Sequence, residues 1–303
     1  MTAPVAITGA TGLVGQMVCD VAAERGMVLR ALARSVPTDR AAVDWMEGSL
    51  ADRDALARLV EGTGAVIHIA GLTNTPDPAH FTAANVDGTA NILEACAKSG
   101  VRRLVFVSSL AARKPELSAY GASKAAAEAL VRESGLDWTI VRPPAVYGPR
   151  DRDMLDLFRS ARWGVLPMPP RGATSVIHVR DLATLLLDLV DANATRHRVY
   201  EPDDGREGGW SHTELAHAIG QAVSRRVFAP NLPRGVLSAA ARIDGLVRGD
   251  KAKLTPDRVG YMCHPNWVAR SDRSVPPAIW LPQISGAEGL SQTAGWYREA
   301  GWL

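Results

Sequence analysis

The sequence contains few cysteines, no surplus of charge of one sign and no long apolar run. Its three cysteines, Cys19, Cys96 and Cys263, are odd in number and far apart, which excludes a disulfide framework and a zinc-binding pattern. The 34 Lys and Arg residues balance 32 Asp and Glu residues, which excludes the dense basic surface of a nucleic-acid-binding protein. No apolar run reaches the ~20 residues of a transmembrane helix. We therefore expect no metal site, no nucleic-acid partner and no transmembrane segment.

The composition is that of a globular protein with a substantial core. Of the 303 residues, 47% are hydrophobic and 22% are charged, and a chain of this length buries about three quarters of its unfolded surface. Residues 1–4 lead directly into an apolar strand, without a basic leader and a cleavage site. We expect a cytoplasmic protein whose thiols stay reduced.

The first half of the chain alternates short apolar runs with longer helical patterns, which is typical of repeated β-α-β units around a parallel sheet. Two predicted helices, 14–25 and 83–99, are each followed by a glycine, the residue that commonly ends a helix. The predicted strands are 5–8, 28–32, 65–69, 104–107 and 138–141. The fold class is therefore α/β, a Rossmann-type doubly wound parallel sheet.

The amino-acid composition changes after residue 148. Prolines become frequent, and six of the eight tryptophans lie beyond residue 150. We expect a nucleotide-binding domain over 1–148 and a smaller, mainly substrate-binding region over 149–303. A strand at 175–179 and a helix at 181–190 form a segment, 174–192, that could return to the first sheet. Further helices are predicted at 211–224, 232–247 and 290–302.

One apolar stretch, residues 236–247, is accompanied by Arg234, Arg242 and Arg248. Packing in the core is the prediction for this stretch. A substrate pocket lining and contact with a membrane surface remain as alternatives.

The first predicted strand is followed at once by Thr-Gly-Ala-Thr-Gly-Leu-Val-Gly, residues 8–15. Glycines in such a turn allow the backbone to approach a pyrophosphate and allow the helix to pack on the strand. The helix N-terminus adds amide donors and a favourable dipole. The predicted dinucleotide contacts here are Thr8, Gly9, Thr11, Gly12, Leu13 and Gly15.

The second predicted strand is followed by Arg34 and Ser35, at the place where an NAD enzyme usually presents a carboxylate to the ribose 2′-hydroxyl. Arg34 can pair with a 2′-phosphate, and Ser35 can donate a hydrogen bond to it. The sequence therefore predicts NADP as the cofactor, with NAD as the alternative.

Tyr120 and Lys124 lie four residues apart in a predicted helix and so share one face of it. An ordinary tyrosine, with a pKa near ~10, is a poor acid or base at neutral pH, and a neighbouring ammonium stabilises its phenolate. Two serines, Ser108 and Ser109, end the preceding strand, where such folds bind ligands.

These residues resemble the short-chain dehydrogenase/reductase superfamily, in its extended and atypical, epimerase/dehydratase-like branch. The resemblance assigns a catalytic triad to Ser109, Tyr120 and Lys124, with Ser108 as the alternate serine, and it lets Lys124 hold the nicotinamide ribose. Three more elements match: Asn-Val-Asp-Gly-Thr-Ala-Asn at 85–91, Arg-Pro-Pro-Ala-Val-Tyr-Gly-Pro at 142–149 and Val-Arg-Asp-Leu-Ala at 179–183.

The resemblance also implies further cofactor contacts. It places Ser49 and Leu50 near the adenine, Ala70 and Gly71 near the ribose and phosphate, and Pro143 and Val146 near the nicotinamide. The family's usual Gly-Asp-Leu appears here as Gly-Ser-Leu at 48–50, so one carboxylate contact is missing. The catalytic Thr-Asp-Glu of the dehydratases is also absent, which argues against dehydration.

The closest pattern is that of dihydroflavonol reductases and 3β-hydroxysteroid dehydrogenases. It implies an NADP-dependent oxidoreductase that interconverts a ketone and a secondary alcohol on an apolar, steroid-, flavonoid- or lipid-like small molecule. A nucleotide-sugar 4-epimerase with retained NAD and a non-catalytic NADPH-binding scaffold or sensor are the alternatives. Relatives often dimerise through helices equivalent to 83–99 and 120–133, so a homodimer is also expected.

Overall fold

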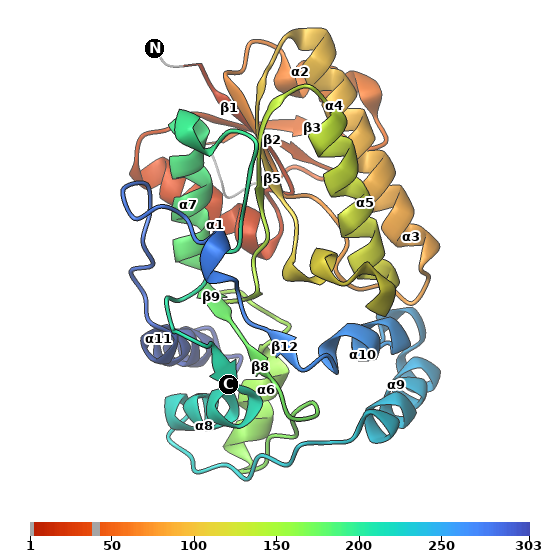
Figure 1. Ribbon diagram of the computed structural model, residues 1–303, viewed down its shortest axis with the longest axis vertical. Coiled ribbons are helices and arrows are strands. Elements are labelled where there is room, and N and C mark those ends of the chain that lie inside the picture. The colour runs from red at the N-terminus through yellow and green to blue at the C-terminus, as the bar shows by residue number, and fades with distance from the viewer. Residues whose placement is uncertain (1–2, 38–42) are drawn as a thin grey trace. The chain divides into compact units, whose positions relative to one another are not determined.

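Seven parallel strands form the central sheet, in the order β10-β6-β5-β4-β1-β2-β3 (Figure 1). The computed structural model describes residues 3–37 and 43–303. The strands are β1 (Val5–Thr8), β2 (Leu29–Ala33), β3 (Val43–Glu47), β4 (Ala65–His68), β5 (Arg103–Val107), β6 (Asp137–Val141) and β10 (Arg198–Tyr200). The order reverses between β1 and β4, which opens a crevice at the carboxyl ends of these two strands. The predicted Rossmann-type fold is confirmed.

All five predicted strands are present within one residue of their expected ends, and two further strands join the sheet at its edges. In β3, Val-Asp-Trp-Met-Glu, only Val43 is buried, so its sequence lacks the continuous apolar run of a central strand. The other edge strand, β10, has only three residues. Edge strands of this kind give weak sequence signals.

Helices cover both faces of the sheet (Figure 1). One face carries α1 (Leu13–Glu24) and α7 (Val179–Asp191), which are linked by an ion pair of 2.7 Å between Arg25 and Asp188. The other face carries α2 (Arg53–Val60), α4 (Gly88–Ser99) and α5 (Ala119–Glu133). Short helical turns occupy Leu110–Arg113, Pro115–Leu117 and Asn193–Thr195.

The helix predicted at 83–99 is not uniform. It begins as α3 (Ala79–Phe81), continues as a π-helix over Thr82–Asp87 and becomes α4 at Gly88. It ends as expected at Gly100, whose φ of 72° lies in the left-handed region that glycine adopts without strain.

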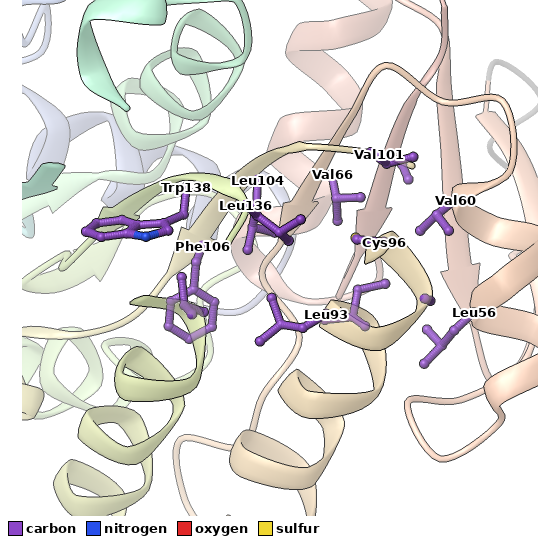
Figure 2. Close-up of a cluster of buried hydrophobic side chains, with 14 of the residues drawn as sticks. Leu56, Val60, Val66, Leu93, Cys96, Val101, Leu104, Phe106, Leu136 and Trp138 are labelled. Carbon is purple, nitrogen blue, oxygen red and sulfur yellow. The ribbon is translucent and has the colours of Figure 1, made fainter. Parts of the chain in front are cut away.

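The second face of the sheet packs over a continuous apolar core (Figure 2). Its side chains come from the strands and from α2, α4 and α5, and they include Leu56, Val60, Val66, Leu93, Cys96, Val101, Leu104, Phe106, Leu136 and Trp138. Burial of each large side chain of this kind contributes roughly 1.5–3 kcal/mol. This core holds the strands whose carboxyl ends carry the candidate site.

The chain forms two compact units. The first comprises the described residues up to Arg142 together with Ala183–Tyr200 and Pro276–Trp280, and the second comprises Pro143–Leu182, Glu201–Val275 and Leu281–Leu303. The strand expected at 175–179 does not join the seven-stranded sheet. As β9 (Val176–His178) it pairs with β7 (Ala145–Tyr147), and β10 extends the sheet instead. The assignment of residues 149–303 to substrate binding stays a prediction.

The second unit has a core of its own. Buried Tyr147, Phe158, Trp210, Leu290 and Tyr297 belong to it. Its other strands are β8 (Ala173–Thr174), β11 (Trp210–Ser211) and β12 (Asn266–Trp267). Its helices are α6 (Leu155–Arg162), α8 (His212–Ala222), α9 (Arg234–Arg248), α10 (Pro256–Met262) and α11 (Gly286–Glu299), with short turns at Gly249–Lys251 and Ser271–Arg273.

The core-packing prediction for residues 236–247 is wrong. Helix α9 buries only Leu237 and Ala241, against α10. Its other large apolar side chains are exposed, namely Val236, Ile243, Leu246 and Val247. Among the described residues, no helix combines the length and the apolar character needed to cross a bilayer.

Arg103 ties the last turn of α7 and the segment that follows it to the sheet. From β5 it donates hydrogen bonds to the carbonyl oxygens of Val190 (3.1 Å) and Asp137 (2.7 Å), to that of Leu189 and to Thr195 Oγ1 (3.1 Å). Burial lowers the pKa of Arg103 to about 10, so the guanidinium stays charged at neutral pH. Several carbonyls therefore depend on a single side chain.

We expect Arg103→Met to lower the free energy of unfolding by about 3 kcal/mol, because it leaves buried carbonyls without donors. Urea denaturation measures this change. The neighbouring Arg102 is mostly exposed, and Arg102→Met should change stability by no more than ~0.5 kcal/mol. Equal effects of the two substitutions would show that Arg103 does not hold this segment.

Candidate active site and cofactor cradle

The glycine-rich turn after β1 brings three backbone segments close together. Gly9 has a φ of 78°, and a Cβ atom there would lie 2.6 Å from the Ala70 nitrogen. A Cβ atom on Gly15 would lie 2.1 Å from the Gly9 carbonyl oxygen. Side chains are therefore excluded at both positions, and the loops after β1 and β4 meet at the crevice of the sheet.

The N-terminus of α1 suits an anion. Gly12 is the N-cap, no side chain caps the helix, and no acidic residue lies in its first turn. Thr11 and Gly12 are exposed, Leu13 begins the helix, and the Gly12 N–H donates to the Gly9 carbonyl at 3.0 Å. An exposed helix N-terminus with close backbone approach fits the pyrophosphate of a dinucleotide.

A buried chain of hydrogen bonds connects the ends of β1 and β4 to the helix that follows. Thr89 Oγ1 donates to the Asn85 carbonyl at 2.6 Å, so its contact of 3.1 Å with His68 Nε2 requires that nitrogen to carry the proton. His68 Nδ1 then accepts from Thr8 Oγ1 at 2.6 Å, and Thr8 Oγ1 accepts from the Ala70 N–H at 3.3 Å.

This chain requires a neutral imidazole. Burial, together with the positive charge of Lys124, lowers the pKa of His68 to about 3. The sequence analysis did not select His68. Its position at the last residue of a buried apolar strand, next to Ile69-Ala70-Gly71, was the available signal.

The helix segment at 85–91 holds the loops that follow β3 and β4. Asn85 Oδ1 accepts from the Leu72 N–H at 2.7 Å, and its Nδ2 donates to the Leu72 carbonyl at 3.0 Å. Asn91 Nδ2 donates to the Leu50 carbonyl at 2.8 Å. A Cβ atom on Gly88 would lie 2.7 Å from Leu50 Cδ1. The polar residues of this motif thus position the segments predicted to contact the adenine and the ribose.

Tyr120 and Lys124 are both buried and lie one turn apart on α5. Lys124 Nζ donates to the Val107 carbonyl at 2.8 Å and lies 4.7 Å from the centre of the Phe106 ring. A Cβ atom on Gly71 would lie 3.8 Å from the same Nζ. The Lys124 ammonium is therefore placed at the ends of β4 and β5.

Burial lowers the pKa of Lys124 to about 8, and the Glu128 carboxylate opposes this shift. The lysine is protonated in most molecules at pH 7. It loses its charge at a much lower pH than an exposed lysine does, which ordinarily has a pKa of ~10.4.

The two serines at the end of β5 have different environments. Ser108 is buried, and its hydroxyl donates to Glu128 Oε1 at 2.6 Å. Ser109 is half-buried, and its Oγ accepts from the Ala111 N–H at 3.2 Å, so its own hydrogen can point elsewhere. A Cβ atom on Gly121 would lie 2.8 Å from the Ala111 carbonyl, so the start of α5 packs on the turn that follows Ser109.

Glu128 is a buried acceptor that the sequence analysis missed. Besides Ser108, it accepts from Arg142 Nε at 2.8 Å, Arg142 Nη2 at 2.7 Å and Arg132 Nη2 at 3.0 Å. It lies one turn after Lys124 on α5, and that spacing was the available signal. The hydrogen of the Ser108 hydroxyl is therefore already engaged in this buried network.

The remaining predicted cofactor residues lie at ends of strands or in loops, except Val146, which is the middle residue of β7. Arg34 and Ser35 follow β2 and are exposed. Ser49 is half-buried, and its Oγ accepts from the Ala51 N–H at 3.3 Å. Pro143 and Val146 belong to the second unit, so the structure does not place them against Tyr120.

His178 is buried in the second unit next to the Tyr147 ring. Burial lowers its pKa to about 4, with a smaller contribution from Arg180. Within residues 3–37 and 43–303, no three His, Cys, Asp or Glu side chains converge as metal ligands would.

We expect Lys124→Met to stabilise the protein at pH 7. The unfolded lysine has a pKa of ~10.4, and burial lowers that of the folded lysine to about 8. The unfolded chain thus binds more protons between these values, and wild-type stability rises with pH there. The advantage of the variant should be largest below pH 8 and shrink as the pH approaches ~10.4. Urea denaturation across this range measures it.

Lys98→Met is the matched control, because Lys98 is exposed on α4, and its effect should stay within ~0.5 kcal/mol. If Lys124→Met were less stable than the wild type at pH 7, the contacts of Lys124 with Val107 and Phe106 would outweigh the cost of burying its charge.

Comparisons with known proteins place the chain in a family. Residues 5–201 match the model of the NAD dependent epimerase/dehydratase family. Ceramide reductase of Caulobacter vibrioides is 35% identical, over 99% of this chain and 96% of its own length. The 2-alkyl-3-oxoalkanoate reductase of Stenotrophomonas maltophilia is 29% identical, over 94% of this chain and 96% of its own length.

Among solved structures, MoeE5 in complex with UDP-glucose and NAD has a TM-score of 0.78 at 20% identity, covering 98% of this chain and 99% of that one. This likeness concerns the fold. The family match and the similarity to reductases over the whole chain indicate an NAD(P)-dependent enzyme of the oxidoreductase or epimerase type. The chain belongs to the NAD dependent epimerase/dehydratase family.

Proposed function

We propose that this protein is an NADP-dependent reductase that converts a ketone on a long-chain, lipid-like molecule into a secondary alcohol. The observation that carries the proposal is the buried Lys124 ammonium, which is bonded to the Val107 carbonyl two residues before Ser109 and lies one turn from Tyr120. Burying such a charge costs free energy. At a catalytic site, the charge can stabilise negative charge that develops during the reaction.

The proposed chemistry assigns one task to each side chain. A bound nicotinamide dinucleotide supplies the hydride that adds to the carbonyl carbon. The Ser109 hydroxyl donates a hydrogen bond to the carbonyl oxygen, where negative charge grows. Tyr120 transfers its phenolic proton to that oxygen, and Lys124 stabilises the resulting phenolate. Gly9, Gly12 and Gly15 leave room for the pyrophosphate at the start of α1.

The names of two relatives support a lipid-like substrate. One is a ceramide reductase and the other a 2-alkyl-3-oxoalkanoate reductase, and each aligns over more than nine tenths of this chain. We therefore propose the keto form of a ceramide-type lipid as the first substrate to test.

Two further expectations remain proposals. A reducing, cytoplasmic compartment is supported by the three cysteines, which are all free. A homodimer through α4 and α5 is supported by Ala126 and Ala129, which are exposed on α5, whereas Ala127 is buried in the protomer's own core.

The first test is reduction of this ketolipid in detergent micelles, followed as loss of NADPH absorbance. Tyr120→Phe should lower kcat by about a thousandfold, because it removes the proton donor. Ser109→Ala should lower kcat by about a hundredfold, through loss of the hydrogen bond to the developing oxyanion.

Ser108→Ala is the control for the serine assignment. It should leave kcat near the wild-type value and lower stability by about 1–2 kcal/mol, since it removes a donor from the buried Glu128. Loss of kcat in Ser108→Ala but not in Ser109→Ala would reverse the assignment. A Tyr120→Phe variant that retained a tenth of wild-type activity would exclude the proposed proton donor.

The second test is the choice of cofactor, measured by calorimetric titration with NADPH and with NADH. The wild type should bind NADPH more tightly, and Arg34→Asp should weaken NADPH binding by at least about tenfold, because a charged hydrogen bond is replaced by repulsion. Arg58→Asp is the control, since Arg58 is an exposed arginine on α2 and the same charge change there should have little effect.

Preference of the wild type for NADH would contradict the NADP assignment. Nucleotide that stays bound through purification, together with stabilisation by a nucleoside diphosphate sugar, would favour the epimerase alternative.

A further inference from the structure

Most of the large apolar side chains exposed on the described residues fall into two groups in the second unit. Four belong to α9: Val236, Ile243, Leu246 and Val247, of which Leu246 is 87% and Val247 is 77% exposed. We call these four residues the α9 face. Three more, Trp163, Val165 and Phe228, form what we call the Trp163 patch, with Trp163 88% exposed. The remaining four, Val28, Val36, Leu72 and Leu281, are scattered along the chain.

The α9 face follows from the helical period. Val236, Ile243 and Val247 are seven and four residues apart and so lie on one side of the helix, with Leu246 beside them. Leu237 and Ala241 lie on the opposite side and pack against α10. The helix is therefore apolar on both sides, but only one side has a partner among the described residues.

The Trp163 patch lies close to the start of α9. The Phe228 N–H donates to the Gly164 carbonyl at 2.8 Å, and the Leu166 N–H donates to the Phe228 carbonyl at 2.9 Å. Phe228 precedes Pro233, the N-cap of α9, by five positions, and extended backbone spans at most ~3.6 Å per residue. Phe228, one of the three residues of the patch, therefore lies within ~18 Å of the beginning of the helix.

This region is strongly basic. Residues 223–248 contain five arginines, Arg225, Arg226, Arg234, Arg242 and Arg248, against a single acidic residue, Asp244. All five arginines are exposed, and one of them, Arg248, pairs with Asp244 at 3.2 Å. Beside the patch, Arg159, Arg162, Trp163 and Arg225 line a cavity of about 410 Å³. The whole chain has a net charge of only +2, so the positive charge is concentrated here.

We propose that the α9 face and the Trp163 patch bind the surface of an anionic lipid bilayer. Exposed aliphatic and aromatic side chains enter the boundary between headgroups and acyl chains, and arginines around them pair with lipid phosphates. A second copy of the chain is the competing occupant. The excess of arginine disfavours it, because a face packed against its own copy would bring like charges together.

This inference does not rest on the proposed reductase activity, since membrane binding is measured without substrate or dinucleotide. The experiment is co-flotation of the full chain with vesicles of phosphatidylcholine, with or without phosphatidylglycerol. The wild type should bind the vesicles that contain phosphatidylglycerol at least about tenfold more strongly, and added salt should weaken the binding.

The variant Ile243→Glu/Leu246→Glu should lose at least about tenfold in binding, and Arg225→Glu/Arg226→Glu should lose binding to the anionic vesicles. Val28→Glu is the matched control, because Val28 is a 59% exposed apolar residue of the first unit, and it should bind as the wild type does. Since every changed side chain is exposed, thermal unfolding should confirm that the variants fold.

Three results would overturn the proposal. The wild type could fail to float with either kind of vesicle, or it could bind equally to vesicles with and without phosphatidylglycerol. The variant Ile243→Glu/Leu246→Glu could bind as strongly as the wild type. A wild-type dimer that this variant converts to monomers, without flotation of the wild type, would assign the face to a second copy. Sedimentation velocity measures that state.

Discussion

The hydrogen bond between Thr8 and His68 is the contact on which the arrangement of the site depends. It is buried and it joins the last residues of two neighbouring strands, and its direction is fixed by the hydrogen bond that Thr89 donates to the Asn85 carbonyl. Through it the glycine-rich turn, the loop at Ala70 and the helix at Asn85 hold fixed positions relative to one another. A binding site built in this way is pre-organised, and little conformational entropy is lost when a ligand enters.

The parts of the candidate site that were selected from the sequence are those that depend on local spacing. The glycines at 9, 12 and 15 and the four-residue interval from Tyr120 to Lys124 need no knowledge of distant contacts. His68 and Glu128 were missed because their roles arise from partners 60 and 20 residues away. The buried hydrogen bond from Ser108 to Glu128 was missed for the same reason, because no pattern in the sequence connects Glu128 to the end of β5. Edge strands β3 and β10 were missed because they lack a continuous apolar run.

The second unit shows a different limit of sequence reasoning. Helical periodicity in residues 232–247 correctly predicted α9, but periodicity does not say how many sides of a helix the protein itself covers. The interpretation as core failed because α9 and α10 bury only a small cluster around Leu237, Ala241 and Val259. The exposed apolar side chains of α9 and the arginines around them therefore form a surface on the second unit. The sequence of this unit departs most from the cofactor-binding pattern.

The π-helix at Thr82–Asp87 has a consequence for the comparison of related chains. A π turn holds one more residue than an α turn, so it amounts to a single-residue insertion between Phe81 and Gly88. Phe81, on one side of it, lies 5.8 Å from the Tyr120 ring between centroids, and Gly88, on the other side, packs against Leu50. A homologue with a regular α-helix here would align with a one-residue gap, and its helix would turn by ~100° relative to this one beyond the gap. Such a homologue would need a different residue in place of Phe81 beside the tyrosine.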